Sequence, residues 1–97
     1  MQHYHRTHLT SEEVLALADG FFPALALAPG PKGTRTRSYS GALGTVTISA
    51  RPEGGHYMFV EAVTDQPGES RLDRNVKRFF VGLHRTEDPA HAMSANY

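Results

Sequence analysis

The sequence contains no cysteine and no tryptophan. The absence of cysteine excludes disulfide bonds, zinc–thiolate sites and thiol nucleophiles. The absence of tryptophan leaves the five phenylalanines to supply most of the bulky apolar volume of a core. A chain without cysteine is typical of a reducing compartment, so we expect a cytoplasmic protein.

Long hydrophobic runs are also absent. The longest largely apolar stretch covers residues 21–29, which is too short to cross a bilayer and contains Pro23. Residues 1–9 are polar and rich in histidine, unlike a secretory signal peptide. We therefore expect a soluble protein without membrane contact.

The chain has no excess of either charge, because ten basic residues balance ten acidic ones. The charges are nevertheless segregated: residues 31–51 and 71–85 are net positive, whereas residues 52–70 are net negative. A uniformly basic chain would indicate nucleic-acid binding, whereas this alternation favours contacts within the chain or between copies of it.

The length of 97 residues and the apolar fraction of 39% indicate a single globular domain over residues 1–97. Residues 1–8 are predicted to be a flexible arm or an edge strand. Residues 89–97 show no periodicity and are predicted to be a loose tail.

Local patterns predict a helix, three strands and a second helix. Thr10 and Glu13 form a capping-box pattern for a first helix that ends near Phe22. Strands are expected at residues 34–40, 45–51 and 56–64, and the last two are expected to pair as an antiparallel hairpin. A second amphipathic helix follows Ser70 and ends at residues 88–89. The predicted fold class is α+β, a two-layer αβββα arrangement with a three-stranded antiparallel sheet.

The strand at residues 56–64 is apolar on both faces. Met58, Val60 and Ala62 alternate along one face. The other face is the predicted interface, because helices on one side would leave it in need of a third layer or a partner chain. Its residues are Tyr57, Phe59, Glu61 and Val63.

The second helix carries an arginine stripe opposite its apolar stripe. At 100° per residue, the four arginines fall within roughly 60° of one another. They are Arg71, Arg74, Arg78 and Arg85. This stripe predicts an anion-binding surface for phosphates or an acidic partner. The alternative is a solvated helix face, or pairing with the acidic segment at residues 52–70.

The helix–strand–strand–strand–helix order over roughly residues 10–85 is similar to that of double-stranded RNA-binding domains. The resemblance is limited to topology. Residues 40–44 read SGALG, without the Gly-Pro-x-His loop of that family. Residues 69–74 read ESRLDR, a helix start in which acids are mixed with the bases.

No motif for catalysis, a cofactor or a metal is recognised. His3 and His5 form an H-x-H pair that could share a metal if extended, but a chain terminus offers no fixed geometry, so no metal site is predicted. Whether the protein is an enzyme is left open.

Three functions remain. The first is a self-associating, homo-oligomeric protein-interaction module. The second is RNA or DNA binding through the basic helix face. The third is a small-ligand-binding protein or enzyme with a site at a sheet–helix or subunit seam.

Overall fold

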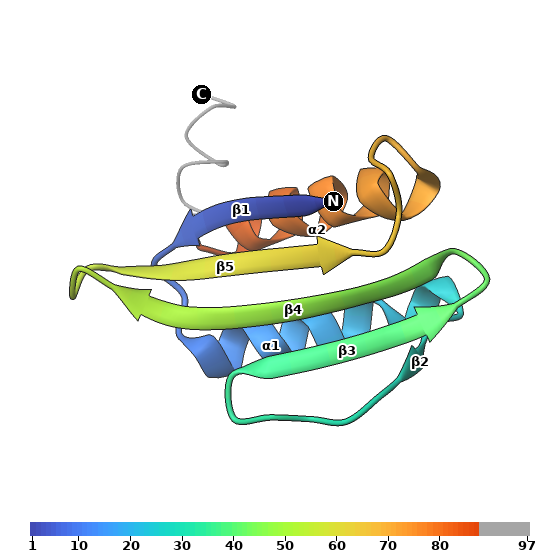
Figure 1. Ribbon diagram of the computed structural model, residues 1–97. Coiled ribbons are helices and arrows are strands. Elements are labelled where there is room, and N and C mark those ends of the chain that lie inside the picture. Colours follow the sequence, from blue (N-terminus) through green and yellow to red (C-terminus); the bar gives the residue numbers. More distant parts are fainter. Residues whose placement is uncertain (88–97) are drawn as a thin grey trace.

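The computed structural model describes residues 1–87, which form a five-stranded antiparallel sheet with two α-helices on one face (Figure 1). In chain order the elements are β1 (Gln2–Thr7), α1 (Ser11–Phe21), the 3-10 turn η1 (Pro23–Leu25), β2 (Ala28–Pro29), β3 (Thr36–Gly41), β4 (Gly44–Glu53), β5 (Tyr57–Thr64) and α2 (Arg71–Glu87). Helix α1 packs against β3 and β4, and α2 packs against β1 and β5.

The prediction of a three-stranded sheet is wrong, although the α+β class and the two layers are confirmed. The strand order is β1-β5-β4-β3-β2. Strand β1 pairs antiparallel with β5, from Gln2 opposite Val63 to Thr7 opposite Met58. Residues 1–8 were predicted to be a flexible arm or an edge strand, and β1 is the edge strand. Pairs this distant in sequence leave no local pattern, so periodicity could not reveal its pairing with β5.

The opposite edge of the sheet is formed by β2, which is not among the three predicted strands. Its two residues pair with β3, Ala28 opposite Ser40 and Pro29 opposite Tyr39. Two residues are too few to produce an alternating pattern, and proline argues against a strand except at an edge.

Helix α1 begins at the predicted capping box. The Thr10 hydroxyl accepts a hydrogen bond from the Glu13 N–H at 3.1 Å, and the Glu13 carboxylate accepts one from the Thr10 N–H at 3.0 Å. Both polar groups satisfy N–H groups that have no partner inside the helix. The helix gives way at Phe22 to the turn that starts with Pro23, where the sequence predicted its end.

The β4–β5 hairpin forms the centre of the sheet and confirms the predicted pairing of these strands. Its register runs from Val46 opposite Thr64 to Glu53 opposite Tyr57. The core lies between this hairpin and the helices. Its buried members include Val14, Ala18, Phe22, Val46, Ile48, Ala50, Val60, Ala62, Leu72, Val76, Phe79 and Leu83.

Buried polar groups connect α1 to the sheet. Tyr39 of β3 is buried, and its hydroxyl donates to a carboxylate oxygen of Asp19 in α1 at 2.7 Å. The Nε of Arg37 donates to the other oxygen at 3.2 Å. Burial, with the hydrogen bond to Asp19, raises the pKa of the Tyr39 hydroxyl above its ordinary value. The tyrosine therefore stays a neutral donor.

Helix α2 presents its predicted apolar stripe to the sheet. Leu72, Val76 and Leu83 are fully buried at helical spacing. The Ser70 hydroxyl accepts from the Asp73 N–H at 3.1 Å, which confirms Ser70 as the cap. The predicted end at residues 88–89 and the predicted tail at 89–97 lie outside the described residues. Neither helix in residues 1–87 combines the length and apolarity that a membrane span requires.

Candidate functional site

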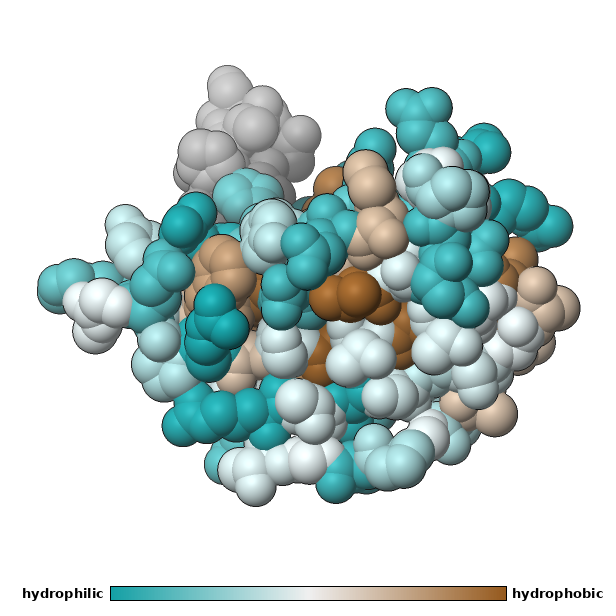
Figure 2. All heavy atoms as spheres, in the orientation of Figure 1, coloured by the Kyte–Doolittle hydropathy of each residue, from teal (hydrophilic) through white to brown (hydrophobic). Residues whose placement is uncertain are grey.

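The sheet face turned away from the helices is the first candidate site, and we call it the open sheet face. Directly opposed residues of antiparallel strands share a face. Tyr4 of β1 and Ser49 of β4 both lie opposite Glu61 of β5, one on each side, and Arg6 and Arg51 flank Phe59 in the same way. The open sheet face consists of Tyr4 and Arg6 from β1; Tyr57, Phe59, Glu61 and Val63 from β5; and Thr47, Ser49, Arg51 and Glu53 from β4. Figure 2 views the molecule from this side and shows apolar patches bordered by hydrophilic residues.

Phe59 is at the centre of this face and is only 8% exposed, although neither helix of residues 1–87 lies on this side of the sheet. Two guanidinium groups lie over its ring, that of Arg6 at 5.3 Å and that of Arg51 at 4.9 Å from the ring centroid. The ring of Tyr4 packs beside it, with centroids 5.3 Å apart. The cations shield an aromatic ring that would otherwise face water, and each contact is stabilised by the ring quadrupole.

Large apolar side chains remain exposed around this centre. Tyr4 is 52% exposed, Tyr57 46% and Val63 37%. The ring of Tyr57 lies at the edge of this face, next to the ring of His8, and the two ring centroids are 4.9 Å apart. Exposed apolar groups gathered on one face, with polar groups around them, are typical of an interaction surface.

The charges on the open sheet face balance. Arg6 donates from Nε to a carboxylate oxygen of Glu53 at 2.7 Å. Arg51 and Glu61 have no ion pair within residues 1–87. The face thus offers one guanidinium and one carboxylate whose charges the described part of the chain leaves uncompensated.

The four predicted interface residues all lie on this face, as their alternation required. Sequence reasoning missed Tyr4, Arg6 and Arg51, which the fold brings beside them. The sequence of residues 1–8 left a flexible arm and an edge strand as alternatives. Its register against β5 could not be read from the sequence at all.

The predicted anion-binding residues lie together on the outer side of α2. Arg71, Arg74, Arg78 and Arg85 are exposed. None of them pairs with the acidic segment at residues 52–70, so this alternative interpretation of the stripe is not seen within residues 1–87. Helix α2 lies on the sheet face opposite to the open sheet face (Figure 1). The arginines are on the side of α2 opposite to its buried apolar stripe, so they are turned away from the sheet.

Asp73 is fully buried at the start of α2, which sequence reasoning did not predict. One carboxylate oxygen accepts from His3 Nε2 at 2.7 Å and from the Thr64 hydroxyl at 2.9 Å. The other accepts from the Ser70 hydroxyl at 2.6 Å. Burial opposes ionisation, but the hydrogen bonds from Ser70, His3 and Thr64 outweigh it and lower the pKa of Asp73 to about 2.

The contact between His3 and Asp73 resembles a catalytic pair, but the groups around it hold elements of the fold together. Every partner of the Asp73 carboxylate is a side chain that joins β1, β5 and α2. The Ser70 hydroxyl donates to Asp73 and not to the imidazole of His3. The arrangement of nucleophile, base and orienting acid that defines a catalytic triad is therefore not formed. The network fixes β1 to the rest of the fold.

His5, the other histidine of β1, does not join His3 in a metal site. The ring of His5 stacks on Phe80 with centroids 5.2 Å apart, and burial lowers the pKa of His5. No group of three or more potential metal ligands occurs among the described residues.

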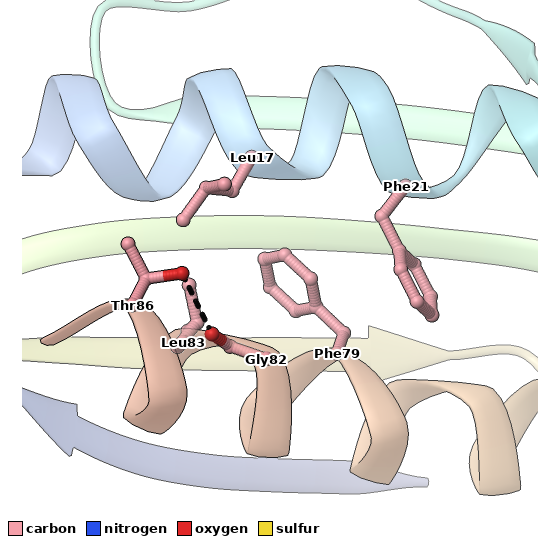
Figure 3. Close-up of a pocket in the computed structure, with 6 residues that line it drawn as sticks. All are labelled: Leu17, Phe21, Phe79, Gly82, Leu83 and Thr86. Atoms are coloured by element: carbon pink, nitrogen blue, oxygen red, sulfur yellow. Dashed lines mark hydrogen bonds between the residues drawn. The ribbon is translucent and has the colours of Figure 1, made fainter. Parts of the chain in front are cut away.

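A small apolar pocket of about 140 Å³ lies between the two α-helices (Figure 3). Its lining is Leu17 and Phe21 from α1 and Phe79, Gly82, Leu83 and Thr86 from α2. The one hydroxyl among them, that of Thr86, donates to the Gly82 carbonyl at 2.9 Å. The pocket therefore presents no free polar group to a ligand and is smaller than usual small-molecule sites.

Comparison with known protein families finds no match to this chain, and comparison with curated proteins finds none either.

Proposed function

We propose that this protein is a self-associating domain in which a second copy covers the open sheet face. The observation that carries the proposal is the exposure of Tyr4, Tyr57 and Val63 around Phe59, on the sheet face that no helix of residues 1–87 covers. Burying these groups against a second sheet would gain roughly 25 cal/mol for each Å² of apolar surface removed from water. Sheets commonly pack in this way, face to face.

Charge complementarity favours a second copy as the partner. A two-fold axis brings each surface against itself, so the face must supply both signs of charge. It supplies Arg51 and Glu61, which have no ion pair within residues 1–87. In a symmetric dimer the Arg51 of each copy can approach Glu61 of the other. Because the charges of this face cancel, it is poorly suited to a strongly acidic or basic partner.

The test is the mass of the protein in solution, measured by light scattering and sedimentation equilibrium from 1 to 500 µM. The wild-type chain is expected to give the dimer mass in the upper part of this range. The double variant Tyr57→Ser/Val63→Thr removes two exposed apolar side chains and is expected to weaken association at least tenfold. Val81→Thr is the matched control, because Val81 is an aliphatic residue, 50% exposed, on the opposite side of the molecule.

Reversing the charges of Arg51 and Glu61 gives a second test of the dimer. Arg51→Glu and Glu61→Arg are each expected to weaken the dimer, and the two together are expected to restore part of the affinity. A wild-type chain that is monomeric at 500 µM would refute the proposal. So would a V81T variant that weakens association as much as the double variant does.

A further inference from the structure

The outer side of α2 carries five exposed cations: Arg71, Arg74, Lys77, Arg78 and Arg85. None of them forms an ion pair within residues 1–87. A row of like charges on one helix destabilises that helix unless an external anion compensates it. The row of cations therefore favours the binding of an anionic ligand from outside the described residues.

The acids of α2 do not neutralise this row, because both are engaged on the inner side. Asp73 is fully buried in its hydrogen-bond network. Glu87 accepts from the Thr7 hydroxyl at 2.7 Å and from the His8 N–H. Within residues 71–87, the charged groups on the exposed side of the helix are all cations. The exposed Glu69, which precedes the helix, lines a hollow with Arg74 and Lys77.

The row is also partly pre-organised. The Asn75 side-chain amide donates to the Arg71 carbonyl at 2.8 Å, and its oxygen accepts from the Arg78 guanidinium at 3.0 Å. These contacts hold Arg78 beside Arg71 and Arg74, and together they line a shallow hollow of about 230 Å³. A guanidinium held in place loses less conformational entropy when it binds a phosphate.

The length of the row distinguishes an extended polyanion from a small anion. At 1.5 Å per residue, Arg71 and Arg85 are separated by roughly 21 Å along the helix axis. One phosphate group would occupy only one end. A nucleic-acid strand presents phosphates repeatedly over such a distance.

A membrane surface fits less well than a nucleic acid. A helix that lies on a bilayer inserts its apolar side, but the apolar side of α2 is buried against the sheet. Its exposed large hydrophobic residue, Val81, is not enough for insertion.

We propose that α2 binds the phosphodiester backbone of nucleic acid, without reading base sequence. Phosphate contacts position a protein and carry no sequence information of their own. This inference does not depend on the proposed dimer, because the open sheet face is on the opposite side of the molecule.

The test is fluorescence anisotropy with labelled 20-nucleotide RNA and DNA, each single-stranded and as a duplex, at 50 and 200 mM salt. Four phosphate contacts predict that affinity falls roughly 50-fold for single strands and 150-fold for duplexes between these salt concentrations. The four probes distinguish RNA from DNA and one strand from two as the preferred source of the backbone.

The double variant Arg74→Gln/Arg78→Gln is expected to weaken binding and to reduce the slope of log affinity against log salt by roughly 1.5. Both side chains are exposed, so circular dichroism should be unchanged. Lys32→Gln/Arg35→Gln is the matched control: it makes the same change in net charge in the loop before β3. It is expected to leave the slope unchanged.

Three outcomes would overturn the proposal. One is the absence of binding by all four probes at 50 mM salt. Another is an equal loss of affinity in the control, which would mean that net charge alone is responsible. The third is equal or tighter binding to polyglutamate of matched charge, which would indicate an acidic protein as the partner.

Discussion

Asp73 adds a buried side-chain contact to the backbone pairing of β1 with β5, since its carboxylate accepts from His3 of β1 and from Thr64 of β5. In the sequence it stands between Leu72 and Arg74, where it is indistinguishable from a solvated acid on an amphipathic helix. Its burial arises from a strand that lies 70 residues earlier. This is a kind of contact that local pattern cannot reveal.

We predict that Asp73→Asn destabilises the protein by about 2 kcal/mol at pH 7, because it removes charged hydrogen bonds from a buried network. The folded pKa of Asp73, about 2, is below its ordinary value of 3.8. A lowered pKa gives stability that is complete above about pH 4 and is lost as pH falls toward 2. Urea unfolding at pH 7, 4 and 2.5 measures this.

The difference in unfolding free energy between wild type and D73N should therefore shrink from pH 4 to pH 2.5. Glu69→Gln is the control, because it removes an exposed negative charge close to the same helix start. We expect it to change stability by less than about 0.5 kcal/mol. A D73N–wild-type difference that is independent of pH would show that the carboxylate charge contributes nothing.

Among the secondary-structure elements, those defined by their own residues were predictable. The capping box of α1, the β4–β5 hairpin and the Ser70 cap each depend on neighbouring residues, and each was found. Elements β1 and β2 depend on distant partners, and the predicted sheet lacked both. The same division applies to the open sheet face, whose β5 residues were identified and whose β1 residues were not.

We predict that Thr10→Ala destabilises the protein by about 1 kcal/mol, because it removes the side-chain acceptor at the start of α1. The denaturant midpoint should fall without a change in slope. Ser11→Ala, one residue along, is the matched hydroxyl deletion, since no hydrogen bond of the Ser11 side chain is seen within residues 1–87. An equal loss in both variants would mean that the cap is not responsible.

At the scale of the whole molecule, the two outer surfaces differ in charge. The open sheet face is balanced and partly apolar, whereas the exposed side of α2 is uniformly basic. A dimer that buries the open sheet faces would leave both arginine stripes exposed, one on each outer side. Two linked stripes would then bind one long nucleic acid more tightly than either stripe alone.

Self-association also predicts that thermal stability depends on protein concentration. If the dimer unfolds to separate chains, mass action raises the Tm as the concentration increases. For a chain of this size, we expect an increase of about 5 to 8 °C from 5 to 500 µM. Differential scanning calorimetry at both concentrations measures it. The Y57S/V63T variant should lose this dependence, and a wild-type Tm that does not change with concentration would contradict the dimer.

The two edges of the sheet are unequal, and this difference limits how copies of the chain could pair edge to edge. Within residues 1–87, β1 is hydrogen-bonded to another strand on one side only. The opposite edge ends in the two residues of β2, one of them a proline without an N–H. If two copies paired their β1 strands edge to edge, the short β2 edge of each copy would face outward. Growth would stop at a pair, so this sheet is a poor template for a fibril.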